Sequence, residues 1–178
     1  MAKLSVILGS TRQQRLGKRV ASWVMQAAEP MLPNQVELID LRDLALPWYD
    51  EPKTPDELKG KYHHPAAQLW YEKIVATEKL IFITPEYNHS YPGVLKNAID
   101  YMFSDWKGKP YLIVSYSMGG YGGVRAAMQL RGLLDYMGLD CQGELNIPLV
   151  DKTFSADGVT NDKELTHRLQ KLLTHHDG

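Results

Sequence analysis

Short apolar runs alternate with segments of helical period along this chain of 178 residues. The runs have the length and composition of buried strands. They are 4–8, 36–41, 80–84, 110–115 and 145–149. Strands that alternate with helices form a parallel sheet, because each crossover helix carries the chain back to the same edge. The alternation therefore predicts an α/β fold with helices on both faces of the sheet.

Apolar residues between and after these runs recur at three- and four-residue spacing, as in helices that bury one face. The predicted helices are 16–27, 66–78, 91–103, 124–137 and 162–176. The segment 46–62 carries prolines and mixed charge, which favours a long loop. Right-handed crossovers leave few ways to wind five strands, and the common one is the flavodoxin-like, doubly wound order 2-1-3-4-5. We expect one domain over residues 1–178.

The composition excludes several functional classes. Lysine and arginine number 20 and aspartate and glutamate 21, so a net charge of −1 gives no footprint for nucleic acid or an anionic membrane surface. The apolar runs are far shorter than a membrane span, and the first residues lack the features of a signal peptide. Cys141 is the only cysteine, so no intrachain disulfide is possible. We expect a cytoplasmic protein.

The loop after the first predicted strand has the character of a phosphate site. A helix start offers unpaired N–H groups and a positive dipole end. Ser10 and Thr11 add hydroxyl groups, and Arg12 and Arg15 add guanidinium groups suited to phosphate oxygens. The plainer alternative is a serine that caps the helix beside two solvated arginines. Neither the Walker pattern nor the dinucleotide pattern Gly-x-Gly-x-x-Gly occurs in this loop.

Two more loops leave the carboxyl ends of strands that the predicted order places near the first. In open α/β sheets this is where ligands bind. Pro85-Glu86-Tyr87-Asn88 offers an aromatic ring, an amide and a carboxylate for a flat heterocycle, although proline and asparagine are also ordinary turn residues. The segment 115–123 has four glycines within five residues, which lets backbone N–H groups approach a ligand closely. The three loops are expected to form one crevice.

Three motifs in this order resemble those of the NADPH-dependent FMN reductase family. They are Gly9-Ser10-x-Arg12, the run from Pro85 to Asp100 (PEYNHSYPGVLKNAID), and Ser117-x-Gly119-Gly120. Members of that family are flavodoxin-like quinone, azo and flavin reductases. This chain is similar to the quinone-reductase branch and to the subgroup with arginine, rather than serine, at position 15. The resemblance covers nearly the whole chain.

The resemblance implies that FMN is the cofactor and assigns it three groups of residues. The phosphate would be held by Ser10, Arg12, Arg15 and the amides near Leu16 and Gly17. The isoalloxazine edge and the ribityl chain would be lined by Pro85, Glu86, Tyr87 and Asn88. The pyrimidine end would meet Ser117, Gly119 and Gly120. FMN would be preferred to FAD, because the hydrogen-bond donors of the first loop converge on a terminal phosphate. The AMP part of FAD would have to leave past Arg12 and Arg15.

The resemblance also implies a reaction. NADPH or NADH would deliver hydride to flavin N5, and a quinone, flavin or similar small acceptor would then be reduced in a ping-pong cycle. We assign no catalytic side chain. We assign no metal site either, since His63-His64 has no third ligand at helical spacing. Relatives are homodimers or homotetramers, with the helices after the third and fourth strands at the interface, where Tyr101, Met102, Phe103 and Trp106 fit unless they are core.

Two other functions stay open at this point. A flavodoxin-type electron carrier shares the fold, but such carriers are usually strongly acidic and have a different phosphate loop. A serine hydrolase would use Ser117, with His167, His175 or His176 in the order that a triad requires, although the pattern Gly-x-Ser-x-Gly fails at Ser115.

Overall fold

The computed structural model describes residues 4–174 and has one five-stranded parallel sheet. Its order is β2-β1-β3-β4-β5, which confirms the predicted winding. The strands are β1 (Leu4–Leu8), β2 (Val36–Asp40), β3 (Lys79–Pro85), β4 (Pro110–Tyr116) and β5 (Asp140–Ile147). Every residue of β1 is buried, as is all of β3 and β4 after the first residue, because helices cover both faces of the central strands. The fold is therefore flavodoxin-like.

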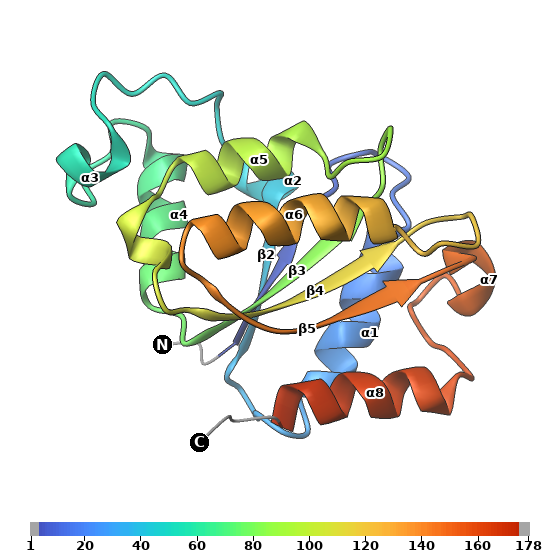
Figure 1. Cartoon of the computed structure of the whole chain (residues 1–178). Helices are drawn as coiled ribbons and strands as arrows, with labels where there is room; N and C mark the ends of the chain where they lie inside the picture. Colours follow the sequence, from blue (N-terminus) through green and yellow to red (C-terminus); the bar gives the residue numbers. More distant parts are fainter. Residues whose placement is uncertain (1–3, 175–178) are drawn as a thin grey trace.

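Helices form one layer on each side of the sheet (Figure 1). On one face lie α1 (Gly17–Ala28) and α8 (Lys163–Thr174), whose buried residues share a core cluster with β1 and β5. The other face carries α4 (Pro65–Val75), α5 (Gly93–Asp100) and α6 (Val124–Tyr136), which pack around Trp70, Trp106 and Phe82. This is the covering expected for strands that read as continuous apolar runs.

Several boundaries differ from the predictions. The segment 46–62 is not entirely loop: Thr54 and Glu57 form a capping box that starts α3 (Pro55–Leu58). It is preceded by α2 (Leu41–Leu44), so the second strand ends one residue early. The fifth strand, expected over 145–149, is Asp140–Ile147. It lies at the edge of the sheet, where polar residues are tolerated, so its first residues do not form an apolar run.

Two helical segments were also assigned differently. The helix expected over 91–103 is shorter, α5 (Gly93–Asp100), and a 3₁₀ turn, η1 (Ser104–Trp106), follows beyond that range. The short helix α7 (Val150–Thr153) has no counterpart among the predicted helices. The predicted end of the last helix, at His176, lies outside the described residues. Tyr101, Met102 and Trp106 are core residues, whereas Phe103 is 45% exposed. Of the four residues considered for an interface, three are therefore buried within the subunit.

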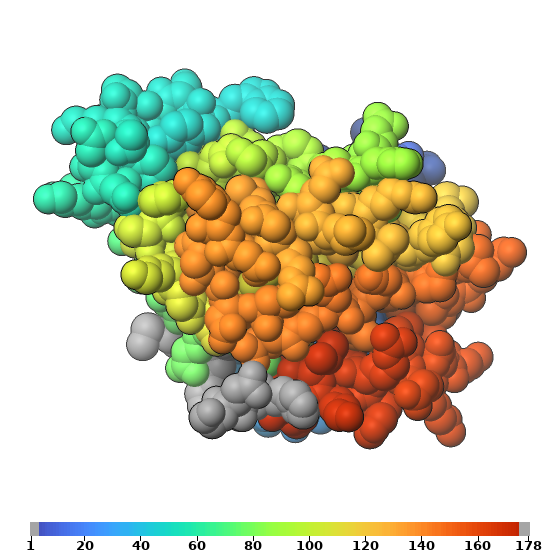
Figure 2. Space-filling model, in the orientation of Figure 1, coloured from blue at the N-terminus to red at the C-terminus, as the bar shows by residue number. Residues whose placement is uncertain are grey.

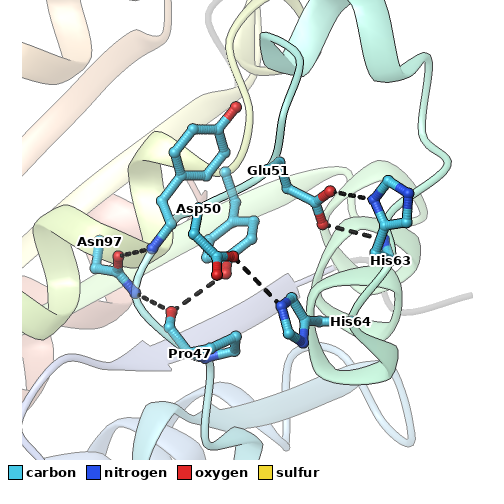
Figure 3. Close-up of polar contacts among 8 residues, drawn as sticks. Pro47, Asp50, Glu51, His63, His64 and Asn97 are labelled. Atoms are coloured by element: carbon cyan, nitrogen blue, oxygen red, sulfur yellow. Dashed lines mark hydrogen bonds and ion pairs between the residues drawn. The ribbon is translucent and has the colours of Figure 1, made fainter.

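The chain between α2 and α4, residues 45–64, forms an excursion that protrudes at upper left in Figure 2, while its Leu58 and Tyr62 side chains pack into the core. Asn97 of α5 holds its first part: the Asn97 side chain accepts from the Tyr49 amide at 2.9 Å and donates to the Pro47 carbonyl at 2.7 Å (Figure 3). The excursion carries Trp48, which is 75% exposed. A buried asparagine thus gives this long segment a defined backbone position.

Histidine–carboxylate pairs close the other end of the excursion (Figure 3). Glu51 accepts from the His63 amide at 3.0 Å and lies 2.5 Å from its Nδ1. His64 Nε2 lies 3.3 Å from Asp50 Oδ1. Burial alone would raise the pKa of Glu51, but the hydrogen bonds from His63 outweigh burial and lower the pKa below its ordinary value. His63 and His64 therefore hold the two ends of the excursion together through Glu51 and Asp50.

Candidate functional site

The three predicted loops meet at the carboxyl edge of the sheet. The register pairs Leu8, the last residue of β1, with Ile83, and Pro85 with Tyr116 at the ends of β3 and β4, so the three strands end at the same edge. The Gly9 amide donates to the Ile83 carbonyl at 2.9 Å, which brings the first loop against the second. A side chain at position 9 would lie 2.9 Å from that carbonyl, so only glycine permits this approach.

Buried Ser10 links the first loop to the second. Its hydroxyl lies 2.8 Å from the Tyr87 hydroxyl, so it does not cap α1. The N-cap residue of α1, Leu16, makes no side-chain capping hydrogen bond, and the first turn of α1 carries no acidic residue. Its positive dipole end, near Leu16 and Gly17, is therefore not answered by a protein anion at the helix start. This arrangement fits an anionic ligand better than the plain capping alternative does.

The two arginines of the first loop occupy opposite environments. Arg12 is exposed, with its guanidinium carbon 6.0 Å from the centre of the Tyr87 ring. The Arg15 side chain is 1% exposed and forms an ion pair through Nη2 with Asp40 at the end of β2. Its Nε and Nη1 are buried and have no hydrogen-bond partner among the described residues. Buried donors without acceptors are costly, so the surroundings of Arg15 fit a ligand that brings acceptor oxygens.

The second loop is a tight two-residue turn that presents Tyr87. Tyr87 and Ser90 exchange backbone hydrogen bonds of 2.8 and 3.0 Å, and Asn88 and His89 both have positive φ. This is the geometry of a type I′ hairpin turn, which favours asparagine. Gln129 of α6 holds the tip by donating to the His89 carbonyl at 2.7 Å. Tyr87 therefore faces Ser10, while Asn88 is exposed at the tip and Pro85 ends β3.

Glu86 ties the second loop to the third. Its carboxylate accepts from the Arg125 amide in the first turn of α6 at 3.2 Å and lies 3.5 Å from Arg125 Nη1. The Arg125 guanidinium in turn lies 5.0 Å from the centre of the Tyr121 ring. A carboxylate at a helix N-terminus is favourable, so Glu86 stabilises the start of α6. Glu86 therefore joins the second loop to the first turn of α6.

The third loop packs against the strand backbone at its Gly122-Gly123 end and is exposed to solvent at its Gly119-Gly120 end. Gly122 and Gly123 have φ of 61° and 81°, and a Cβ on either would lie within 3.0 Å of the strand backbone. In contrast, Gly119 and Gly120 are exposed, and none of the backbone hydrogen bonds found between described residues uses their amides. Ser117 lies beside them and donates its hydroxyl to the Gly119 carbonyl at 3.1 Å. Free amide donors are thus available at this side of the crevice.

Tyr116, at the end of β4, was missed by the sequence reasoning. It is 5% exposed, and a Cβ on Gly17 would lie 2.5 Å from its hydroxyl oxygen. Burial raises the pKa of this tyrosine above its ordinary value, with the Tyr87 side chain adding to the shift. The phenol therefore underlies the first turn of α1. The sequence did hold a signal for Tyr116 as a site residue, since it directly precedes Ser117 at the end of a strand. Its large apolar ring is, however, equally typical of a core residue.

Asp40 was missed for a different reason. It is the last residue of β2, and it falls inside the predicted strand 36–41, where nothing local marks it as a site residue. Its pairing with Arg15 joins residues 25 positions apart in the sequence. A carboxylate at the carboxyl end of a strand beside the phosphate loop was the available signal, once the order 2-1-3-4-5 had placed β2 next to β1.

The described residues give no support to a hydrolytic or metal site. The Ser117 hydroxyl bonds to a backbone carbonyl, and none of its hydrogen bonds found there involves a histidine; His175 and His176 lie outside the described part. Within residues 4–174 no group of three histidine, cysteine, aspartate or glutamate side chains is placed to hold a metal ion. None of the described helices is long and apolar enough to cross a membrane.

Comparisons with known proteins agree with the motifs. The model of the NADPH-dependent FMN reductase family matches residues 2–147. An NAD(P)H-dependent FMN reductase of Schizosaccharomyces pombe is 38% identical over 135 residues, which is 76% of this chain and 66%, just under two thirds, of that protein. A quinone reductase of Pseudomonas putida is 32% identical over 167 residues, covering 90% of this chain and 85% of the relative.

A solved structure extends the agreement to three dimensions. FerB of Paracoccus denitrificans, described as a flavoenzyme NAD(P)H:(acceptor) oxidoreductase, superposes with a TM-score of 0.74 at 26% identity. The superposition covers 97% of this chain and 93% of FerB. The family indicated by the sequence motifs is confirmed: the chain belongs to the NADPH-dependent FMN reductase family.

Proposed function

We propose that this chain is an FMN-dependent NAD(P)H oxidoreductase that reduces a quinone, a flavin or a similar small acceptor. The observation that carries the proposal is the buried Arg15 guanidinium, two of whose nitrogens lack acceptors, next to the uncapped start of α1. A phosphate supplies both the negative charge and the several acceptor oxygens that this corner lacks. The names of the relatives, NAD(P)H-dependent FMN reductase and quinone reductase, supply the reaction class.

The residues of the crevice divide the binding of FMN between three loops. Ser10, Arg12 and Arg15 would hold the phosphate, together with the backbone near Leu16 and Gly17. The segment 85–88 would line the ring edge and the ribityl chain, with Tyr87 beside Ser10 and Glu86 keeping the second and third loops together. Ser117, Gly119 and Gly120 would meet the pyrimidine end of the flavin.

The chain's own contribution to the reaction is binding and electrostatic stabilisation. When bound, FMN would supply the redox chemistry, the transfer of a hydride equivalent from NAD(P)H to the acceptor. The free amides of Gly119 and Gly120 would donate to the pyrimidine end, where negative charge develops on reduction. Hydride transfer to and from a flavin requires no protein acid or base, so we assign no catalytic side chain.

Steady-state oxidation of NADPH and NADH with a quinone tests this proposal. We expect turnover that depends on added FMN and saturates with it. Turnover should be weaker with FAD, because the hydrogen-bond donors of the first loop converge on a terminal phosphate. An electron carrier would need a separate reductase, so turnover by the purified chain alone also separates the two functions. Equal support by FAD would contradict the phosphate assignment, and no turnover with any flavin would contradict the reductase.

We further propose a homodimer, or a homotetramer built from it, that uses the face formed by α5 and α6. A groove of about 510 Å³ lies between α3, α5 and α6 and is lined partly by Phe103 and Tyr136. Phe103, Met128 and Tyr136 are exposed there or on the adjoining part of α6. Exposed large apolar side chains that gather on one face are typical of protein interfaces.

Molecular mass in solution tests the assembly. Wild-type protein is expected to sediment as a dimer or tetramer, and Tyr136→Glu is expected to shift it toward monomer, because a buried unpaired carboxylate is costly at an interface. Leu149→Glu, at an exposed position outside this face, is the matched control. A monomeric wild type, or equal effects of both changes, would refute the proposed face.

The cytoplasmic location and the extent of the domain over 1–178 stay predictions.

A further inference from the structure

We propose that Asp40 is a positioning residue for FMN: it holds the Arg15 guanidinium so that the remaining guanidinium donors serve the phosphate. The inference rests on the proposed function, because it concerns the same cofactor site. It adds a residue from β2, a strand whose end the sequence motifs do not include. Asp40 would act through Arg15 and would not touch FMN itself.

The sheet register explains how Asp40 reaches the phosphate loop. Asp40 is paired in the parallel ladder with Leu8, the last residue of β1, so its carboxylate lies beside the loop that begins at Gly9. Both carboxylate oxygens are engaged. Oδ1 accepts from the Arg42 amide at 3.0 Å and caps α2, while Oδ2 pairs with Arg15 Nη2. A carboxylate bonded at both oxygens has little freedom to rotate, and it therefore gives Arg15 a defined partner direction.

Burial makes this pairing consequential. The Arg15 side chain is 1% exposed and the Asp40 side chain 10% exposed, so both charges are largely withdrawn from water. A buried guanidinium without a counter-charge would be strongly unfavourable, and Asp40 supplies that charge. Asp40 engages one of the three guanidinium nitrogens and leaves Nε and Nη1 without acceptors. The pair is therefore balanced in charge but incomplete in hydrogen bonding.

The incomplete pair has a direct consequence for ligand choice. Phosphate oxygens accept charge-assisted hydrogen bonds from a planar guanidinium, whereas the ribityl hydroxyl of riboflavin offers a neutral acceptor at the same end. The Arg15 donors would therefore favour FMN over riboflavin. If Asp40 aims those donors, the ratio of riboflavin to FMN dissociation constants depends on Asp40. If Asp40 only neutralises charge, its removal leaves the site more positive and raises that ratio. If Asp40 only caps α2, the ratio does not change.

Flavin titrations of purified variants measure this ratio. Asp40→Asn keeps an oxygen for the Arg42 amide and presents an NH₂ group to Arg15, so the Arg15 guanidinium loses its acceptor. We expect the ratio to fall about tenfold, the scale of one lost hydrogen bond to a charged group. Glu37→Gln is the matched control: Glu37 lies on the same strand and pairs with Lys73, and the ratio should not change.

A double-mutant cycle shows whether Asp40 acts through Arg15. Arg15→Gln should itself lower the ratio, and adding Asp40→Asn to it should lower the ratio no further. The double variant also removes the buried charge, so it folds even if Asp40→Asn alone does not. Asp40→Glu offers a second route: it keeps the charge but displaces the carboxylate by one methylene, and it should lower the ratio as well.

The outcomes separate this inference from the proposed function. Wild-type protein that binds no flavin, or binds riboflavin as tightly as FMN, would remove the proposed phosphate site itself. A wild type that prefers FMN, with an unchanged or raised ratio in Asp40→Asn or an unchanged ratio in Asp40→Glu, would overturn the role of Asp40 alone. The role would also be overturned if Asp40→Asn weakened both flavins equally while lowering the melting temperature, or if its effect persisted in the Arg15→Gln background.

Discussion

Arg12 and Arg15 lie three residues apart in one loop but are held in opposite ways. Arg12 is exposed beside the Tyr87 ring and free to meet a ligand from solvent. Arg15 is buried against Asp40 and keeps two donors without acceptors. The residue types and their loop were predictable from the sequence. Their division of labour was not, because it depends on Asp40, a contact set by the neighbouring strand and not by local spacing.

The exposed arginine gives the residue-scale prediction. Arg12→Ala should weaken FMN binding roughly ten- to a hundred-fold, since a lost hydrogen bond to a charged group costs about 1.5–3 kcal/mol. Its exposure predicts that the fold is unaffected. Flavin titration measures the affinity, and thermal melting of the flavin-free protein is the control. Unchanged affinity would remove Arg12 from the site, and a large drop in the melting temperature would mean that its role is structural.

The elements at the crevice are locked together by contacts that local sequence does not reveal. Glu86 caps α6, Gln129 holds the tip of the second loop, and Tyr116 lies under the first turn of α1. The strand ends and the Gly-rich loop were predictable from apolar runs and turn residues. The type I′ turn was not assigned in advance, because Asn88-His89 lacks the glycine that usually marks it. Long-range packing decided these details.

Gly17 and Tyr116 give a prediction at the level of two packed elements. A Cβ at position 17 would lie 2.5 Å from the Tyr116 hydroxyl oxygen and 2.9 Å from Leu8 Cδ1. Gly17→Ala should therefore destabilise the protein by about 1–3 kcal/mol through overpacking, although alanine is the better helix former. Denaturant unfolding measures the change. Tyr116→Phe in the same background should recover part of the loss. A Gly17→Ala variant as stable as wild type would contradict this packing.

The excursion 45–64 gives a prediction on pH. Because the pKa of Glu51 is lowered in the folded state, its stabilisation is present above the unfolded value of about 4.3. It is lost as the pH falls through the folded value. Glu51→Gln should therefore be less stable than wild type at neutral pH and should lose less stability on acidification. Glu78→Gln, an exposed position, is the control. Parallel acid-unfolding curves for wild type and Glu51→Gln would contradict the tie.

At the scale of the whole molecule, one topological fact organises the site. The order β2-β1-β3-β4-β5 brings the ends of three sequence-distant strands to one edge, and the end of β2 joins them through Asp40. The alternation of apolar runs and helices was sufficient to predict this order, because crossover handedness leaves few choices. The edge strand β5 and the short helix α3 were less predictable, since their burial is partial and their apolar pattern correspondingly weak.

The absorption spectrum of the purified protein tests the central claim most directly. After equilibration with FMN and removal of free flavin, we expect the visible bands of bound oxidised flavin to remain with the protein. Addition of NADPH or NADH without oxygen should bleach these bands, and addition of a quinone should restore them. Protein that retains no flavin, or whose bound flavin neither nicotinamide donor bleaches, would contradict the assignment of this chain as an FMN-dependent NAD(P)H oxidoreductase.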